Sequence, residues 1–330
     1  MSEAGSVEWA AEVAGSVLDR VSEAVVGHRK SLELVLAVVL SGGHVLLEDV
    51  PGLGKTLTAR SLAQALGLRF RRVQFTPDLL PADVTGSYVW DQRDGRWDFR
   101  AGPVFTELLL ADEINRTPPR TQAALLEAMQ ERQVTVEGTT HALGAPWVVV
   151  ATANPIEYEG TYQLPEAQLD RFSARVDFGY LDAGGERQVL LRRMHRQREE
   201  VEVAPVTDAA GLLAMQRVVE AVLVEHSVVD YVVALVRATR ARPEVLVGSS
   251  PRGGLATMLC ARAMAVIDGR PFVTPDDVKR VAPATLAHRL TLRPESWLSG
   301  VSATDVVRSV LDEVPVPDTD ALPEHERADR

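Results

Sequence analysis

The stretch Leu46–Thr56, LLEDVPGLGKT, constrains this chain more than any other part of it. A short apolar segment runs into a glycine-interrupted loop that ends in Gly-Lys-Thr. In a phosphate-binding loop, glycines let backbone N–H groups point at phosphate oxygens, a lysine reaches the β and γ phosphates, and a hydroxyl holds Mg²⁺. The ligand-binding residues expected from this loop are Pro51, Gly52, Leu53, Gly54, Lys55, Thr56 and Leu57.

One position departs from the usual pattern of such loops. Asp49 stands where that pattern has a glycine, and Gly-Lys-Thr alone is also compatible with an ordinary surface turn. The flanking sequence favours the phosphate loop, because His44–Glu48 is typical of a buried strand and Lys55–Leu66 of a helix that Gly67 ends.

Length and composition set the broad class of the protein. A chain of 330 residues fits two domains, or one domain with a substantial appendage. No membrane span is expected, because charge interrupts the apolar segments well before roughly 18 residues. The N-terminus has no basic start followed by an apolar run, so we expect a cytoplasmic protein. Cys260, the single cysteine, is expected in a buried helix, and the scattered histidines disfavour a permanent transition-metal site.

The charge distribution bears on nucleic-acid binding. The net charge of −11 disfavours general binding to nucleic acids. Arg187–Arg198 is a local basic stretch, but Glu186 precedes it and Glu199, Glu200 and Glu202 follow it closely. These acids cancel most of the field, so a solvated helix face or a linker is favoured over a nucleic-acid contact.

Strands and helices are predicted to alternate between His44 and Phe178, after two N-terminal helices. The predicted strands are His44–Glu48, Phe70–Phe75, Phe105–Glu113, Trp147–Thr152 and Arg175–Phe178. Between them lie Lys55–Leu66, a helix capped by Thr117 and ending near Glu131, Pro165–Phe172, and hairpins at Ser87–Phe99 and Gln133–Leu143. This alternation predicts a parallel sheet with helices on both faces.

Polar residues follow two of the buried strands. Asp112 and Glu113 end FTELLLADE, and Asn154 comes two residues after Trp147–Thr152. With a phosphate loop upstream, we favour Asp112 as an indirect Mg²⁺ ligand and Glu113 as the base that polarises water, over ordinary surface acids. The carboxyl end of a central strand is where α/β sheets place groups that contact a ligand, which favours a role for Asn154.

Beyond Tyr180 the strands are predicted to stop. We expect a charged helix and linker in 182–205, helices from Asp208 to about Leu290 with a helix start at Thr274–Asp277, and disorder in Asp318–Arg330. The expected organisation is a helical lead-in (1–24), an α/β core (25–181) with an insertion at about 79–103, a linker (182–205), a helical domain (206–292) and a C-terminal segment (293–330).

Five motifs together resemble those of an AAA+ ATPase, specifically a MoxR-type one: LLEDVPGLGKT, LLLADEINR, ATANP, LPEAQLDRF and SPRGG. TPDLLPADVTGSYVW, GPVF and EGTYQLPEAQLDRF make the resemblance specific, and it covers about 25–290. It implies a parallel-sheet P-loop AAA+ core with helices on both faces, followed by a small all-helical lid domain. The insertion matches the helix-2 insert of this group, which usually faces the pore of the ring or the client protein. Asp49 resembles the loops of MoxR-type proteins, in which this position tolerates acids.

The resemblance also implies roles for single residues. Val26 and Gly27 match the segment beside the adenine, Lys55 and Thr56 the phosphate-binding lysine and the Mg²⁺-binding hydroxyl, and Asp112 and Glu113 the metal-linked and catalytic acids. Asn154 matches the sensor that aligns water with the γ-phosphate.

The same resemblance assigns two arginines. Arg171 matches the arginine finger supplied to the neighbouring subunit. Arg175 is an alternative, but its predicted position in a strand favours an ordinary structural role. Arg252 matches the second sensor arginine. Whether Arg252 contacts its own ATP or that of a neighbour stays open, and capping of a lid helix is the alternative role.

The function implied is ATP hydrolysis with ATP and Mg²⁺ by a homo-oligomeric ring, expected to be a hexamer. Such a ring remodels or matures a client or adaptor protein, for example one with a von Willebrand factor A domain or a metal centre. Two alternatives are a helicase-like nucleic-acid motor and an ATP-binding scaffold or switch with negligible turnover. The net charge argues against the first, and the intact Asp112, Glu113 and Asn154 against the second.

Overall fold

The computed structural model describes residues 5–155, 161–162, 164–198 and 201–317. The disorder expected for Asp318–Arg330 lies outside these residues, as does part of the EGTYQLPEAQLDRF motif. None of the described helices is long and apolar enough to cross a membrane.

The helices, including the 3₁₀ turns η1 and η2, are α1 (Val7–Ala24), α2 (Arg29–Leu40), α3 (Lys55–Ala65), α4 (Pro81–Thr85), η1 (Ile114–Arg116), α5 (Pro119–Glu131), α6 (Glu166–Leu169), α7 (Ala183–Arg196), α8 (Ala209–Ala221), α9 (His226–Ala241), α10 (Pro251–Ile267), α11 (Pro275–Leu286), η2 (Ala287–Arg289), α12 (Pro294–Leu298) and α13 (Ala303–Glu313). The strands are β1 (Val45–Glu48), β2 (Phe70–Gln74), β3 (Gly86–Asp91), β4 (Arg96–Ala101), β5 (Leu108–Asp112), β6 (Gln133–Val136), β7 (Thr139–Ala142), β8 (Val148–Ala153), β9 (Ala174–Val176), β10 (Val245–Val247) and β11 (Thr291–Leu292).

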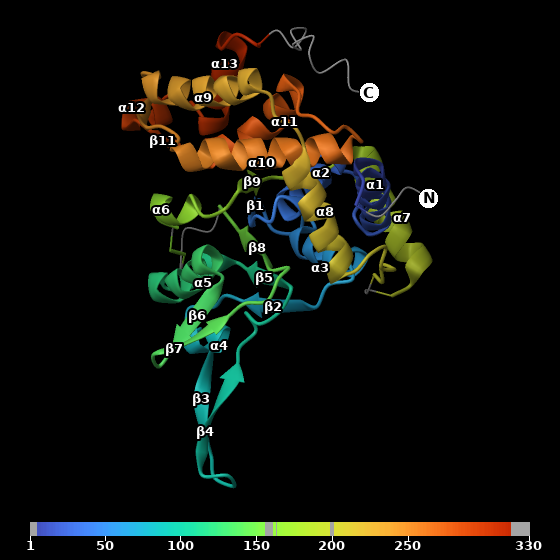
Figure 1. Cartoon of the computed structure of the whole chain (residues 1–330), viewed down its shortest axis with the longest axis vertical. Coiled ribbons are helices and arrows are strands. Elements are labelled where there is room, and N and C mark those ends of the chain that lie inside the picture. Colours follow the sequence, from blue (N-terminus) through green and yellow to red (C-terminus); the bar gives the residue numbers. More distant parts are fainter. Residues whose placement is uncertain (1–4, 156–160, 163, 199–200, 318–330) are drawn as a thin grey trace.

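In the described part of the chain, the core is a five-stranded parallel sheet with the order β2-β5-β8-β1-β9 (Figure 1). The predicted parallel sheet is confirmed. β5 and β8 are largely apolar, as is typical of strands inside a parallel sheet, and every residue of both strands is buried. Because β5, β8 and β1 are neighbours and parallel, the segments that follow them leave the sheet at the same edge.

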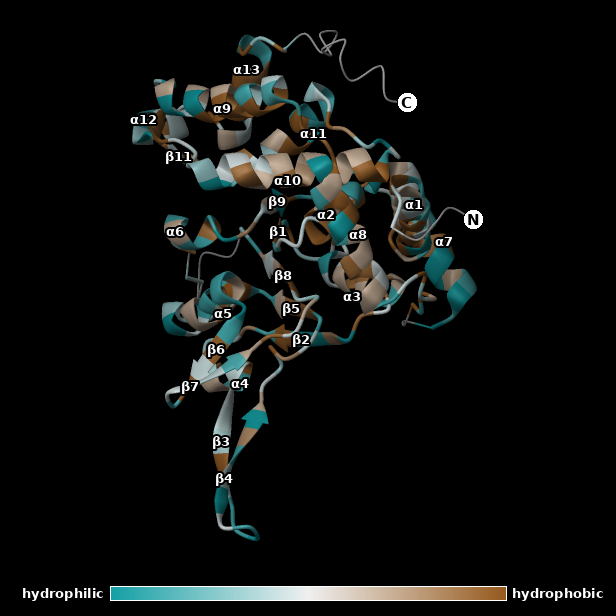
Figure 2. Ribbon diagram, viewed as in Figure 1, coloured by the Kyte–Doolittle hydropathy of each residue, from teal (hydrophilic) through white to brown (hydrophobic). Residues whose placement is uncertain are grey.

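Alternate side chains of these strands contribute to two apolar cores, one on each face of the sheet. Val45 and Leu47 pack with residues of α1, α2 and α3, whereas Leu46 packs with residues of α5 on the opposite face. Figure 2 shows hydrophobic residues gathered on α1 and α2 and hydrophilic residues along α7. The prediction of helices on both faces is therefore confirmed.

The predicted insertion contains α4 and the β3–β4 hairpin, which projects away from the body of the molecule (Figure 1). At its base, Phe99 of β4 stacks on His141 of β7, with 3.8 Å between ring centroids. Farther along the hairpin, Trp90 and Trp97 form an edge-to-face pair and are 47% and 62% exposed. The aromatic residues thus anchor one end of the hairpin and leave a pair uncovered on the other.

The helices from α8 onward form a lid on the core (Figure 1). Its helical character is confirmed, but the expectation that strands stop beyond Tyr180 is wrong, because β10 and β11 pair as an antiparallel ribbon. Strands of three and two residues are too short to show the period of two by which a strand is recognised in a sequence.

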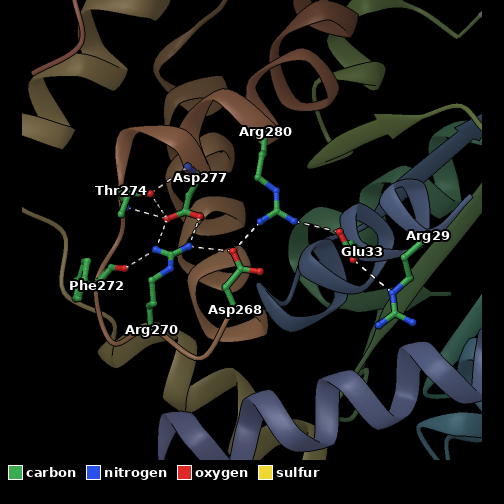
Figure 3. Close-up of polar contacts among 8 residues, drawn as sticks. All are labelled: Arg29, Glu33, Asp268, Arg270, Phe272, Thr274, Asp277 and Arg280. Carbon is green, nitrogen blue, oxygen red and sulfur yellow. Dashed lines mark hydrogen bonds and ion pairs between the residues drawn. The ribbon is translucent and has the colours of Figure 1, made fainter.

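An ion pair joins the lid to the core, and further ion pairs lie beside it within the lid (Figure 3). Arg280 of α11 donates to Glu33 of α2 at 3.0 Å and to Asp268, at the end of α10, at 2.7 Å. Arg270 donates to Asp268 at 3.0 Å and to the buried Asp277 at 2.6 Å. Because α10 also packs directly against α2, both apolar and charged contacts fix the lid on the core.

Two local predictions are wrong. Thr117 does not cap α5, since Pro118 occupies the N-cap position and the Thr117 hydroxyl donates to the carbonyl of Thr76 at 3.1 Å. The second strand of the hairpin near Glu137 is β7 rather than 141–143. Glu137 and Gly138 both have positive φ and form a two-residue turn, so pairing resumes at Thr139.

Candidate nucleotide-binding site

The loop after β1 lies between two cavities. One, of about 360 Å³, is lined by Pro51, Gly52, Gly54, Lys55, Thr56, Leu57, Arg72, Asp112, Glu113, Thr152 and Asn154. The other, of about 640 Å³, shares Pro51, Gly52, Gly54 and Leu57 with it and adds Leu53 and residues of α1 and α7. We call them the phosphate-side and the base-side cavity.

The glycines of the loop adopt backbone conformations that other residues rarely take. Gly52 and Gly54 have φ of 86° and 82°. A Cβ atom added to either would meet no described atom within 4 Å, so their backbone faces open space where a ligand can approach. The loop therefore fits a polyphosphate.

Lys55 begins α3 and points back across the loop. Its Nζ donates to the carbonyl oxygens of Asp49 and, at 2.9 Å, Ala153. Burial lowers the pKa of Lys55, and the carboxylates of Asp49, Asp112 and Glu113 oppose that shift. The acids favour the charged form of Lys55, and an ammonium at the mouth of the loop suits an anionic ligand.

The ends of β1, β5 and β8 bring the predicted metal-binding pair together. Thr56 Oγ1 donates to Asp112 Oδ2 at 3.2 Å, and Asp112 is only 6% exposed. Thr152 Oγ1 donates to Asp112 Oδ1 at 2.6 Å, and Arg72 pairs with Asp112 Oδ2 at 2.7 Å. A hydroxyl beside a carboxylate is a donor set that Mg²⁺ accepts, so these residues fit the metal that accompanies a nucleotide.

Glu113 follows β5 in a left-handed conformation, with φ of 56°. For a residue other than glycine this is a strained geometry that structures retain at functional sites. Its backbone N–H donates to Thr152 Oγ1 at 2.8 Å, and its carboxylate accepts from Gln74 at 2.6 Å and pairs with Arg116 at 3.2 Å. The side chain lines the phosphate-side cavity, where it can receive a proton from water.

Asn154 comes directly after β8 and is 4% exposed. It lines the phosphate-side cavity together with Lys55 and Glu113. Its carbonyl accepts from Asn115 Nδ2 at 3.1 Å, which ties the segment after β8 to the segment after β5. Asn154 therefore lies at the same edge of the sheet as Lys55 and Glu113.

The base-side cavity contains residues that the sequence did not indicate. Val26 lines it, and a Cβ at Gly27 would lie 2.7 Å from a methyl of Leu181, which also lines the cavity. The far wall is α7, which contributes Val189, Leu190, Arg192, Arg193 and Arg196. The arginine stretch interpreted as a solvated face or linker is thus in part a cavity wall.

Gln74, Arg72 and Thr152 were also missed, although each holds one of the acids. Gln74 ends β2. The rule that singled out Asn154, a polar residue at the carboxyl end of a core strand, would have indicated Gln74 as well.

The three arginines considered as finger or sensor line neither cavity, as far as the described residues go. Arg171 lies just after α6, and no described side chain pairs with its guanidinium. Arg175 in β9 pairs with Glu48 at 2.9 Å. Arg252, on the first turn of α10, lies 3.7 Å from the Asp170 carboxylate.

Known proteins resemble this chain in sequence and in fold. A family model described as "ATPase family associated with various cellular activities (AAA)" matches residues 44–174, and one for an "AAA lid domain" matches 237–310. Chaperone MoxR1 of Mycobacterium tuberculosis is 41% identical over 314 residues, which cover 92% of this chain and 82% of that protein. This chain belongs to the MoxR-type AAA+ ATPases.

Two further comparisons support the MoxR-type assignment. The uncharacterized protein YeaC of Bacillus subtilis is 46% identical over 304 residues, which cover 92% of this chain and 94% of YeaC. A candidate ATPase from Cytophaga hutchinsonii, solved by crystallography, has a TM-score of 0.87 and 38% identity, with 94% and 97% of the two chains covered. The family implies that this chain binds ATP.

Proposed function

We propose that this chain hydrolyses ATP with Mg²⁺ within a homo-oligomeric ring, expected to be a hexamer, in which a neighbouring subunit completes each site. One observation carries the proposal. The loop, the acids and Asn154 gather at one edge of the sheet, whereas Arg171 and Arg252 lie outside both cavities and flank Asp170. Two arginines placed away from the chain's own site are suited to the site of another subunit.

The roles within one subunit follow from the contacts. The loop glycines and Lys55 bind the phosphates, and Thr56 with Asp112 would hold Mg²⁺, which neutralises charge on phosphate oxygens when it is bound. Glu113, held by Gln74, accepts a proton from the attacking water, and Asn154 orients that water. Val26, Gly27 and α7 enclose the base.

The choice of finger rests on what each arginine already contacts. Arg175 is engaged with Glu48 inside the sheet, so using it elsewhere would leave that carboxylate unpaired. Arg171 has no such partner among the described residues. We therefore assign Arg171 as the finger and Arg252 as a sensor that, like Arg171, acts on the ATP of the neighbour.

The finger assignment is tested by mixing two inactive variants. Arg171→Ala keeps its own pocket and Glu113→Gln keeps its finger, so mixed interfaces should contain complete sites. In related systems an arginine finger raises the turnover rate by a factor of roughly 10³–10⁵. Arg171→Ala alone should therefore bind ATP and hardly hydrolyse it. Full activity of Arg171→Ala alone, or no recovery on mixing, would contradict the assignment.

We also propose that hydrolysis drives remodelling of a client protein, as the name of the relative Chaperone MoxR1 suggests, with a von Willebrand factor A domain or metal-containing protein as the expected client. The exposed Trp90 and Trp97 support a protein contact at the projecting hairpin. Glu113→Gln should retain a client from a lysate in the presence of ATP, and Lys55→Ala should not. Identical retention by both variants would count against an ATP-controlled client site.

A further inference from the structure

The segment that carries the finger is held from the lid by one buried arginine. The side chain of Arg289, in η2, is 3% exposed, and its Nε donates to Asp170 Oδ1 at 2.7 Å. Its Nη2 donates to the carbonyls of Asp170 and Phe172 at 3.2 and 2.8 Å, and its Nη1 donates to that of Ser173 at 3.3 Å. The Asp170 side chain before Arg171 and the backbone carbonyls after it therefore all accept hydrogen bonds from one guanidinium.

This geometry depends on the shape of the arginine head group. The planar guanidinium presents its N–H groups as a rigid fork, which can reach a carboxylate and several carbonyls at once, whereas a lysine ammonium cannot. His288, next to Arg289, adds a contact between its Nε2 and the Phe172 carbonyl at 3.1 Å, and the Phe172 side chain is fully buried. The segment is thus fixed by polar contacts on its backbone and by packing of its ring.

Asp170 contacts both Arg289 and Arg252 of the lid. Its Oδ1 accepts from Arg289, and its Oδ2 lies 3.7 Å from Arg252. A buried guanidinium without a partner is strongly unfavourable, so Arg289 constrains where Asp170, and with it Arg171, can lie. Asp170 therefore connects the finger and the sensor assigned above to one point on the lid.

Direct contacts join the lid to its own core. Arg280 pairs with Glu33 of α2 (Figure 3), and α10 packs on α2. Because the lid is joined to the core, the contacts of Arg289 fix the segment around Arg171 relative to the whole subunit. The position of Arg171 at an interface then depends on Arg289 even though Arg289 is itself buried.

We propose that Arg289 and Asp170 form a latch by which the lid positions the finger Arg171 for ATP hydrolysis in the neighbouring subunit. This inference rests on the proposed function, since it requires that Arg171 act on the site of another subunit. Arg289 is a positioning residue in this account, because its contacts are all within its own chain. Loss of the latch should impair the neighbour's site and leave the chain's own pocket intact.

The test uses Arg289→Met and Asp170→Asn in the full-length protein, each alone and mixed with Glu113→Gln. Displacing a catalytic group by about 1 Å costs roughly 10²-fold in rate, so each latch variant alone should lose about that factor in turnover. Its affinity for ATP should stay within about twofold of the wild type. Mixing with Glu113→Gln should restore turnover, because an intact finger then enters the intact pocket of the latch variant.

A matched control separates the latch from a general loss of lid stability. Arg242 is another lid arginine, 17% exposed and paired with Glu313 at 2.9 Å, but its partners lie on α13. Arg242→Met should keep near wild-type turnover at a temperature below its unfolding transition. If Arg289→Met fails to fold, Asp170→Asn carries the test, because the Asp170 side chain is 27% exposed and its loss removes no buried apolar group.

The mixing experiment also separates this inference from the proposed function. If Arg171→Ala is rescued by Glu113→Gln but the latch variants are not, or if they lose ATP affinity as much as turnover, then Arg289 does not act through the finger and the inference is wrong. If Arg171→Ala itself is not rescued, the shared site of the proposed function fails instead. Unchanged turnover in Asp170→Asn and Arg289→Met would also overturn the latch.

Discussion

Asp49 occupies the loop position where the usual phosphate-binding pattern has a glycine, and its carboxylate is fully engaged. Its Oδ2 accepts from the backbone N–H groups of Phe178 and Gly179 at 2.8 and 2.7 Å, and its Oδ1 from that of Val50 at 2.8 Å. The loop is thereby bonded to the chain that leaves β9, just before Leu181 of the base-side cavity. A glycine could not make this connection.

We expect Asp49→Gly to weaken ATP binding by about tenfold, although it restores the usual pattern. The substitution leaves the N–H groups of Phe178 and Gly179 without their acceptor, and the loss at the buried Phe178 costs about 1–3 kcal/mol. Asp49→Asn keeps an acceptor oxygen and should lose less. Calorimetric titration with ATP measures both variants, and wild-type affinity in Asp49→Gly would show that the connection does not support the pocket.

His44 predicts a pH dependence of stability. Burial lowers its pKa to about 4, while its Nδ1 accepts from the N–H of Val149 at 3.0 Å. Because the folded pKa lies below the ordinary value, the unfolded chain binds a proton that the folded chain excludes as pH falls from 6.5 towards 4. This destabilises the fold by about 2 kcal/mol at pH 5 relative to neutral pH, with no such effect above pH 6.5.

The measurement is the free energy of unfolding of the wild type and of His44→Asn between pH 7.5 and 5. Asn keeps an acceptor for Val149 but does not titrate in this range. The stability advantage of the wild type over His44→Asn should therefore shrink as pH falls. An advantage that stays constant or grows on acidification would contradict the buried neutral histidine.

Single residues differ in how far the sequence could predict them. The loop glycines, Lys55 and Thr56 lie within one motif, so their proximity to one another is fixed by local geometry. Gln74 and Arg72 contact the acids from another strand, and only the order β2-β5 of the sheet brings them together. The environment of Asp49 likewise depends on a segment more than a hundred residues away in the chain.

At the scale of elements, strands that are buried on both faces were the most predictable. β5 and β8 are runs of apolar residues, and the structure has them within three residues of the predicted bounds. The role of α7 was not predictable, because its charged sequence reads as a solvated helix. Arg192 bonds the carbonyls of Ser22 and Glu23 at 2.7 and 2.8 Å, which turns that helix into a wall of the base-side cavity.

The start of α11 gives an element-scale prediction with an internal control. Asp277 is 1% exposed, accepts from the backbone N–H of Thr274 at 2.8 Å and pairs with Arg270 at 2.6 Å. Asp277→Ala should therefore destabilise the protein by about 3 kcal/mol, since it breaks both a capping box and a buried ion pair. Asp276, the adjacent acid, has an 88% exposed side chain, and Asp276→Ala should cost less than about 0.5 kcal/mol.

Urea denaturation of the two alanine variants measures this difference. Equal stabilities would show that the capping box and the Arg270 ion pair at the start of α11 contribute little to the stability of the protein. A large loss in Asp277→Ala alone would support the buried cap and ion pair at this position.

At the scale of the whole molecule, the sequence could indicate the components of an ATPase site but could not say which belong to one subunit. Motifs identify Lys55, Glu113 and the arginines equally well. In the fold, the strand ends converge on the loop, whereas Arg171 and Arg252 lie beside Asp170 and outside both cavities. Under the proposed shared site, a single chain should bind ATP and should not hydrolyse it efficiently.

The most direct measurement is ATP turnover per wild-type chain as a function of protein concentration, with the assembly state followed by light scattering in the same samples. Turnover per chain should be low where the chain is monomeric and should rise steeply as rings form, while ATP binding is already complete at the lowest concentration. A turnover per chain that is the same for monomers and assemblies would contradict the shared site.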